Sequence, residues 1–225
     1  MKRNPFTLVE ILVVIAVIAI LMGLMFPALG MVKERAYMKQ SLSDVKNIQM
    51  AVKSFKNDYQ YLPIKPTTAE KGKDVVFYGS KARSTATTTK EKCNDVFKTD
   101  STLQTDYLDL FNTLCYNNSD PTKNGVPPDD AKTLNPKKVI YLTPTSKFVG
   151  ASDKCGFRDP WGRPYVVFLD NDYDNKISLP AGSGVPNDTI YGDVAVFGMG
   201  TFEPGTSDTI DKALKKTSQI VTSWQ

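Results

Sequence analysis

The stretch from Phe6 to Val32 limits what this chain of 225 residues can fold into more than any other part of it. Of its 27 residues, 22 are hydrophobic, and on a helix they would leave no polar face. A helix from Ile11 to Met31 would be about 30 Å long, which is the thickness of a bilayer core. Basic residues flank the stretch on both sides: Lys2, Arg3, Lys33 and Arg35. The stretch therefore predicts a helix that spans a membrane.

Three simpler explanations account for less of this stretch. A buried core helix is disfavoured because the stretch is apolar on every face and lies at the chain terminus. A secretory signal peptide has a shorter apolar region followed by small residues, which Phe-Pro-Ala-Leu-Gly at residues 26–30 does not supply. A plain membrane anchor explains the length but not Glu10 at its edge. An acidic side chain there costs a few kcal/mol, so Glu10 indicates a function and a partner.

The sequence Phe-Thr-Leu-Val-Glu at residues 6–10, after a short basic leader, resembles the class III signal of type IV pilins and type II secretion pseudopilins. Proline at Pro27 also matches the family pattern. The resemblance implies that a prepilin peptidase removes residues 1–5 and methylates the new amine of Phe6. The family has Gly before the cut, whereas this chain has Pro5, which fixes φ and lacks an N–H. Either the peptidase accepts Pro5, or processing is slow or absent.

Beyond Val32 the pattern becomes amphipathic, with apolar side chains at spacings of three and four. They are Leu42, Val45, Ile48, Val52, Phe55 and Tyr59. We expect one helix over residues 6–58, with 6–32 in the membrane and the second half packed on a globular head, residues 59–225. Pro27 removes one backbone hydrogen bond and is expected to kink or loosen the helix. Two helices that meet at Pro27 are the alternative.

The apolar first half of this helix indicates a filament subunit. Once residues 6–32 leave the membrane, they must be buried against copies of themselves, which gives a filament with an apolar helical core. In that core Glu10 would pair with the amine of Phe6 and set the subunit register, because an unpaired buried charge is costly. The resemblance implies assembly by an inner-membrane platform, from a single-pass protein with a periplasmic domain. The product is either a type II secretion pseudopilus or a type IV surface pilus.

The C-terminal part carries a second signature. Asp-Pro-Trp-Gly-x-Pro-Tyr at residues 159–165 resembles the major pseudopilin of type II secretion. Strands are expected at residues 166–169 and within 190–197, and Trp161 is expected to cover one end of the sheet. The resemblance implies a pilin-like α+β fold, a long N-terminal helix packed on a small antiparallel sheet. Residues 64–158 exceed the matching family region and are interpreted as an insertion, with a helix at 102–114 and a candidate strand at 139–142.

An acidic loop follows the first of these strands. Asp170, Asp172 and Asp174 alternate and precede Asn175, a residue that tolerates left-handed φ, so their oxygens can surround a hard cation. The loop is no EF-hand, because its sixth position is not Gly and its twelfth is not Glu. The resemblance implies calcium in loops between these strands. The three aspartates are the candidate ligands, with Asp188 or Asp193 in reserve, and a solvated acidic turn is the alternative.

Composition limits the chemistry that is left. The chain has no histidine, which excludes Ser-His-Asp and Cys-His catalysis and His-ligated zinc, so no enzyme is expected. Its net charge of +4 is too small to indicate a nucleic-acid partner. In an oxidising compartment two of the three cysteines can pair, as Cys93–Cys115 or as Cys115–Cys155. The alternative function is a membrane-anchored, calcium-binding interaction module that does not polymerise.

Overall fold

The computed structural model describes most of the chain. The described residues are 7–64, 72–79, 81–85, 92–97, 105–116, 133–143, 157–179, 188–216 and 218–224, and the side chains at 24, 26–28, 81–85 and 94 lie outside the description. The chain divides into two compact units, which we call the N-terminal unit (Met1–Tyr37) and the globular unit (Met38–Gln225).

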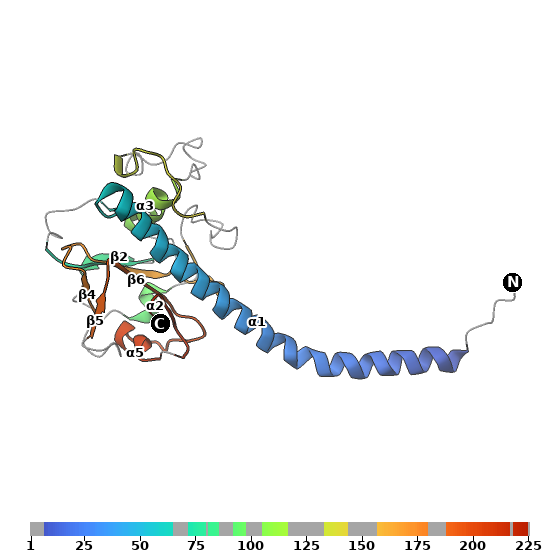
Figure 1. Ribbon diagram of the computed structural model, residues 1–225. Coiled ribbons are helices and arrows are strands. Elements are labelled where there is room, and N and C mark those ends of the chain that lie inside the picture. Colours follow the sequence, from blue (N-terminus) through green and yellow to red (C-terminus); the bar gives the residue numbers. More distant parts are fainter. Residues whose placement is uncertain are drawn as a thin grey trace. The chain divides into compact units, whose positions relative to one another are not determined.

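One helix, α1 (Leu8–Tyr59), supplies the described part of the N-terminal unit and the first element of the globular unit. Its bounds agree with the helix expected over 6–58 to within two residues at the start and one at the end. The backbone stays helical through Pro27, so the alternative of two separate helices is wrong. Figure 1 shows α1 in blue to teal.

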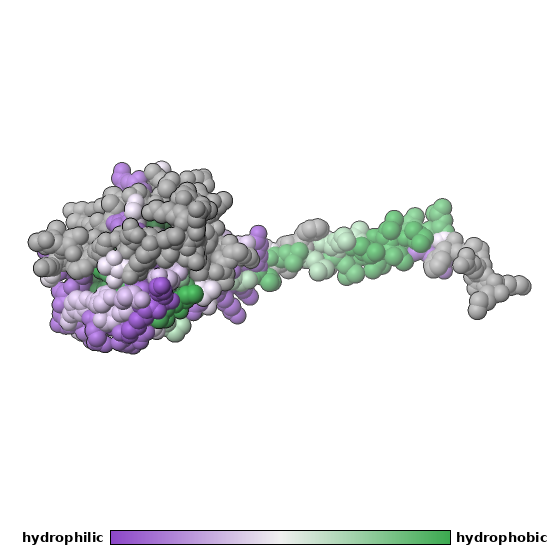
Figure 2. Space-filling view, turned by 90° about the horizontal axis from the view of Figure 1, so that it is seen from above, coloured by the Kyte–Doolittle hydropathy of each residue, from purple (hydrophilic) through white to green (hydrophobic). Residues whose placement is uncertain are grey.

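The N-terminal part of α1 buries no large apolar side chain that the structure describes. Between Leu8 and Val32 these side chains are exposed by 44 % at Ile18 to 81 % at Leu8. Figure 2 shows the resulting hydrophobic surface along the helix. Within the described residues, no helix has the combination of length and hydropathy that a membrane span requires.

The globular unit is built on a five-stranded antiparallel sheet with the strand order β2-β1-β3-β6-β7. Its strands are β1 (Val75–Tyr78), β2 (Lys81–Thr85), β3 (Val166–Leu169), β6 (Val194–Gly198) and β7 (Val221–Thr222). A second, two-stranded antiparallel sheet pairs β4 (Lys176–Ser178) with β5 (Thr189–Tyr191). The expected strand at 166–169 is confirmed as β3. The strand expected within 190–197 is confirmed as β6, and the start of that region also holds the end of β5. Gly192, with a φ of 139°, and Asp193 lie between the two strands.

Helices cover both faces of the five-stranded sheet, which explains why β1, β3 and β6 are buried at every residue. Successive strand residues point to opposite faces. One face packs on α1 and on α3 (Thr105–Cys115), and the other packs on α2 (Cys93–Val96) and α5 (Ile210–Leu214) (Figure 1). From α1, Val45, Ile48, Val52 and Phe55 are fully buried against the sheet. The predicted α+β arrangement of a long helix on an antiparallel sheet is therefore confirmed.

The segment interpreted as an insertion, residues 64–158, is part of the sheet itself. It supplies β1, which lies between β2 and β3, as well as β2, α2 and α3. The helix expected at 102–114 is confirmed as α3. The strand expected at 139–142 is wrong, because Tyr141 N and Leu142 N both donate to the carbonyl of Leu114, at 2.9 and 3.2 Å, and so cap the end of α3.

The two cysteines of the first predicted disulfide lie on opposite faces of the sheet. Cys93 is a buried free thiol in the cluster around α2 and α5, whereas Cys115 ends α3 in the cluster around α1. The Cys93–Cys115 disulfide is therefore not formed, since the sheet separates the two side chains. Cys155 lies outside the described residues, so the Cys115–Cys155 pairing stays a prediction.

Candidate functional site

Glu10 holds the start of α1 through a reciprocal cap. The N–H and Oγ1 of Thr7 donate to Glu10 Oε2 at 2.8 and 2.9 Å, and Glu10 N donates back to Thr7 Oγ1 at 3.3 Å. This is a capping box, in which the two side chains satisfy backbone N–H groups that the first turn leaves without partners. The spacing Thr-x-x-Glu is visible in the sequence and predicts the cap, which is a role of Glu10 in addition to the predicted one in subunit register.

The structure describes little of the other residues predicted for processing and assembly. Pro5 and Phe6 lie outside the described residues, so the cleavage site and the pairing of Glu10 with the Phe6 amine stay predictions. Pro27 lies within α1, and only its backbone is described.

Strand pairing brings together two carboxylates that are far apart in the sequence. β1 and β3 are antiparallel with Val75 opposite Leu169, so the residue before β1 and the residue after β3 meet at one edge of the sheet. These residues are Asp74 and Asp170. Together with Asp172 they offer carboxylate oxygens that all lie within 4.8 Å of one another. We call Asp74, Asp170 and Asp172 the acidic triad.

Two members of the acidic triad are buried. Asp170 is 0 % exposed and Asp74 is 8 % exposed, while Asp172 is open to solvent. Asp170 Oδ2 accepts from Asn175 N at 3.0 Å, and Asp74 Oδ2 accepts from Ser178 N at 2.8 Å. The second oxygen of each, Oδ1, is buried and has no hydrogen-bond partner among the described residues.

Burial also disfavours the charged forms of these carboxylates. It raises the pKa of Asp74 to about 6, with a smaller contribution from the charges of the neighbouring aspartates. It raises the pKa of Asp170 as well, where the hydrogen bond from Asn175 N and the charge of Lys56 act in the opposite direction. Ionised, the triad holds oxygen ligands of the kind that Ca²⁺ prefers.

The structure brings together two of the three predicted ligands and adds one that the sequence analysis missed. Asp174 lies outside the acidic triad, since its Oδ1 accepts from Lys176 N at 2.8 Å. Of the reserve ligands, Asp193 forms an ion pair with Lys56. Nothing in the sequence around Asp74 marks it as a metal ligand, because it precedes β1 and belongs to no acidic motif.

The loop of the acidic triad also contacts the end of α1. Lys56 pairs with Asp193 and lies 5.0 Å from the ring centroid of Tyr173. The hydroxyl of Tyr173 accepts from Leu62 N at 3.3 Å, and Asp170 N donates to Asp193 O at 3.0 Å. The loop after β3 is thus tied to both the sheet edge and the exit of the helix.

A cavity of about 310 Å³ adjoins this loop. It is lined by Tyr61, Leu62, Ile64, Gly72, Leu134, Asn171, Asp172 and Tyr173. Ile64 and Gly72 lie on either side of residues 65–71, which are outside the described residues, so we assign no ligand to the cavity.

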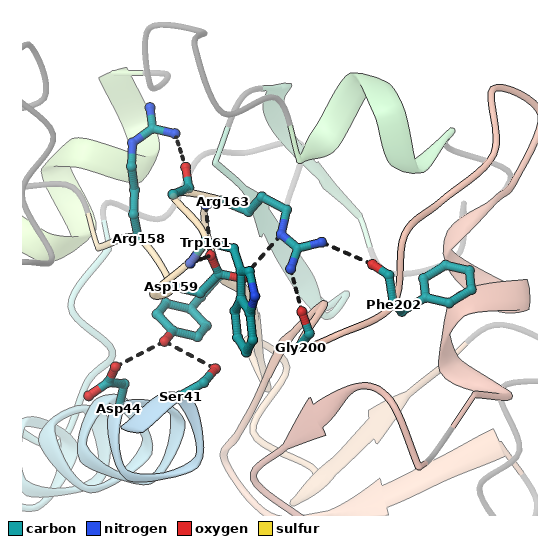
Figure 3. Close-up of polar contacts among 10 residues, drawn as sticks. Ser41, Asp44, Arg158, Asp159, Trp161, Arg163, Gly200 and Phe202 are labelled. Atoms are coloured by element: carbon teal, nitrogen blue, oxygen red, sulfur yellow. Dashed lines mark hydrogen bonds and ion pairs between the residues drawn. The ribbon is translucent and has the colours of Figure 1, made fainter. Parts of the chain in front are cut away.

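The turn at 159–165 joins the start of β3 to the loop that contains Gly200 and Phe202, as Figure 3 shows. Asp159 Oδ1 accepts from Trp161 N at 3.0 Å and from Arg163 N at 2.8 Å. The Arg163 guanidinium pairs with Asp159 at 3.3 Å and donates to the carbonyls of Gly200 and Phe202. The ring centroid of Trp161 lies 5.5 Å from this guanidinium. The contacts give the turn a role in packing.

The same turn contacts α1 through Tyr165. Its hydroxyl donates to Asp44 Oδ2 at 3.1 Å and lies 3.3 Å from Ser41 Oγ (Figure 3). Burial raises the pKa of Asp44 to about 7, against the effect of this hydrogen bond, and the charge of Asp159 adds to the increase. Asp44 is the only charged side chain of α1 that is buried among the residues the structure describes.

Comparisons of this chain with protein-family models, with curated proteins and with solved structures gave no match.

Proposed function

We propose that this protein is the structural subunit of a pilus-like filament, either a type II secretion pseudopilus or a type IV pilus. The observation that carries the proposal is the exposure of α1, which buries none of its described large apolar side chains from Leu8 to Val32. Such a surface is covered in the cell by lipid or by protein, because contiguous apolar surface of this extent is unfavourable in water. A bilayer covers it before assembly, and the same helix of neighbouring copies covers it afterwards.

The start of the helix supports this assignment. Glu10 is the only charged residue between Phe6 and Val32. Its carboxylate already caps the first turn through Thr7 and still carries a negative charge into the proposed apolar core. A buried charge there favours the one register that places a cation beside it, and the amine of Phe6 is that cation in the proposal.

The rest of the proposal follows the resemblance of residues 6–10 to the pilin signal. The protein is a single-pass protein of the inner membrane with its globular unit in the periplasm, and its partners are lipid, prepilin peptidase and an inner-membrane assembly platform. The peptidase cuts between Pro5 and Phe6 and methylates the Phe6 amine. The role is structural and not enzymatic, and it is supported by a sequence with no histidine to transfer protons.

Electron microscopy of assembled material, with N-terminal sequencing of the same sample, tests the proposal. We expect thin filaments that contain the protein and a mature chain that begins at methylated Phe6. Uncleaved monomers in the membrane fraction would contradict it. Filaments whose subunits keep Met1 would retain the assembly role and remove the processing step.

Two matched variants separate the charge of Glu10 from its cap. Glu10→Gln keeps a side chain that completes a capping box but removes the charge. Thr7→Ala keeps the charge and removes the cap, at about 1 kcal/mol of helix stability. The proposal expects Glu10→Gln to lose filaments and Thr7→Ala to form them. The opposite result would show that Glu10 acts as a cap alone.

One observation favours a second function. The acidic triad would suit a membrane-anchored calcium-binding module that does not polymerise. The microscopy above separates the two functions, since the module leaves only single subunits in the membrane.

A further inference from the structure

The apolar surface of α1 ends at a group of exposed charged residues. Val32 is the last residue of the apolar stretch and is 63 % exposed. Lys33, Glu34 and Arg35 follow it directly, and all three are exposed. Neither cation forms an ion pair with Glu34 or with any other residue that the structure describes. Two cations without a partner carboxylate in the described part of the chain therefore lie where the apolar surface ends.

The two cations lie on different sides of the helix. At 3.6 residues per turn, Lys33 and Arg35 are about 200° apart around α1. Tyr37 follows Lys33 by four residues on the same side, and Lys33 Nζ lies 5.4 Å from the centroid of its ring. We call Lys33, Arg35 and Tyr37 the collar. A partner of both sides must surround the helix, as a layer of lipid headgroups does, whereas a helix or strand of another protein would contact one side only.

The collar also has the height of a headgroup layer. From Lys33 to Tyr37 the helix rises by about 6 Å. The headgroup layer is about 5–8 Å thick on each side of a bilayer core, and the apolar stretch before the collar matches that core in length. Basic side chains at this depth extend to the headgroups along apolar stems, and tyrosine is enriched there.

The usual rule of membrane topology does not account for these cations. Positive residues are in excess on the cytoplasmic side of membrane proteins. In the proposed orientation Lys33 and Arg35 lie on the periplasmic side, and the proposed cleavage before Phe6 removes Lys2 and Arg3 from the other side. Attraction to lipid headgroups gives the cations of the collar a role on the side where they lie.

We propose that the collar binds the headgroups of anionic phospholipids while the protein is in the membrane. This inference rests on the proposed membrane-resident subunit and names its lipid partner. Each basic side chain close to an anionic surface strengthens binding about fivefold. Glu34 lies about 100° from each cation and opposes one of these contributions. We therefore expect a net preference of about fivefold for an anionic over a neutral headgroup.

Spin-labelled lipids in vesicles that contain the full chain test the collar. Electron spin resonance gives the association constant of phosphatidylglycerol at the protein relative to that of phosphatidylcholine. We expect a ratio of about five in about 0.01 M salt and a ratio near one in about 1 M salt, where charges are screened within about 3 Å. A ratio of one at low salt, or a preference that high salt leaves unchanged, would overturn the proposal.

Two double variants remove the same charge from different parts of α1. Lys33→Gln with Arg35→Gln removes the cations of the collar, and we expect the ratio to fall to one or below. Lys46→Gln with Lys53→Gln removes two exposed cations of the globular unit and should keep the preference. The exchange Lys33→Arg with Arg35→Lys retains both charges and should keep it as well. Equal ratios in the first two variants, or loss of the preference in the exchange, would contradict the assignment.

Microscopy of the same samples separates this inference from the filament role. Filaments of a wild-type chain that shows no lipid preference would overturn the collar and leave the filament role. A lipid preference without filaments would contradict the filament role alone. If the collar variant kept the lipid preference but lost its filaments, the collar would contact a neighbouring copy instead of lipid, which also overturns the proposal.

Discussion

The two parts of α1 have the same backbone conformation and opposite relations to solvent. From Leu8 to Val32 its described large apolar side chains are all exposed, whereas from Val45 to Phe55 one face is fully buried against the sheet. In the sequence, the second part repeats apolar residues at spacings of three and four, with polar residues between them. The first part is apolar on every side of the helix apart from a few residues. The difference shows that one helix can bury a face within the chain over part of its length and expose its described large apolar side chains over the rest.

The largest expected effect comes from the buried part. Phe55 is 0 % exposed, and its ring centroid lies 4.6 Å from that of Tyr59 and 5.4 Å from that of Tyr141. Phe55→Ala should therefore lower the free energy of unfolding of the globular unit by about 4 kcal/mol, through lost burial and a cavity. Urea unfolding of the detergent-solubilised chain measures this. A loss below about 1 kcal/mol would mean that the helix does not pack on the sheet as described.

The matching change in the exposed part should leave the globular unit intact. Ile15→Asp puts a second carboxylate into the apolar stretch, at a cost of about 3 kcal/mol for insertion in a membrane. We expect the same urea midpoint as wild type but loss of the protein from the membrane fraction and from filaments. Ile15→Leu is the control and should behave as wild type. If Ile15→Asp stayed in the membrane fraction, the comparison would fail, because the exposed apolar side chains of this part of α1 would then not depend on contact with lipid.

A smaller effect concerns the one buried carboxylate of α1. The pKa of Asp44 is raised from 3.8 to about 7, so the fold favours its protonated form. The stability that Asp44 contributes is therefore full below pH 3.8 and is lost as the pH rises through 7. Asp44→Asn should unfold like wild type in acid and be more stable at mildly alkaline pH, by on the order of 2 kcal/mol.

Urea titrations of both proteins across this pH range give the difference directly. Asn still accepts from the Tyr165 hydroxyl, so the packing is preserved. A difference that does not change with pH would assign the effect to packing and not to the charge.

Periodicity explains what could be predicted from the sequence. α1 and α3 repeat apolar residues at spacings of three and four, and both lie within a few residues of their expected bounds. β1 is Val-Val-Phe-Tyr, buried on both faces, so it lacks the alternation that marks a half-buried strand. The candidate strand at 139–142 failed for the opposite reason, because its local β preference yielded to hydrogen bonds with the end of α3.

The ligands of the candidate metal site could likewise be predicted only where a local sequence motif marks them. Asp170 and Asp172 stand in a local motif and were predicted. Asp174 shares the motif, but its carboxylate bonds the backbone of Lys176. Asp74 depends on the pairing of Val75 with Leu169, and one sequence does not reveal a contact between residues so far apart.

The way α1 is embedded has a mechanical consequence. Its buried face, Val45 to Phe55, extends for about 15 Å along the helix and packs lengthwise on the sheet. A force applied along the helix would load these contacts together in shear, and none of them would peel away alone. A force on the N-terminal part of α1 would therefore be spread over many contacts with the sheet.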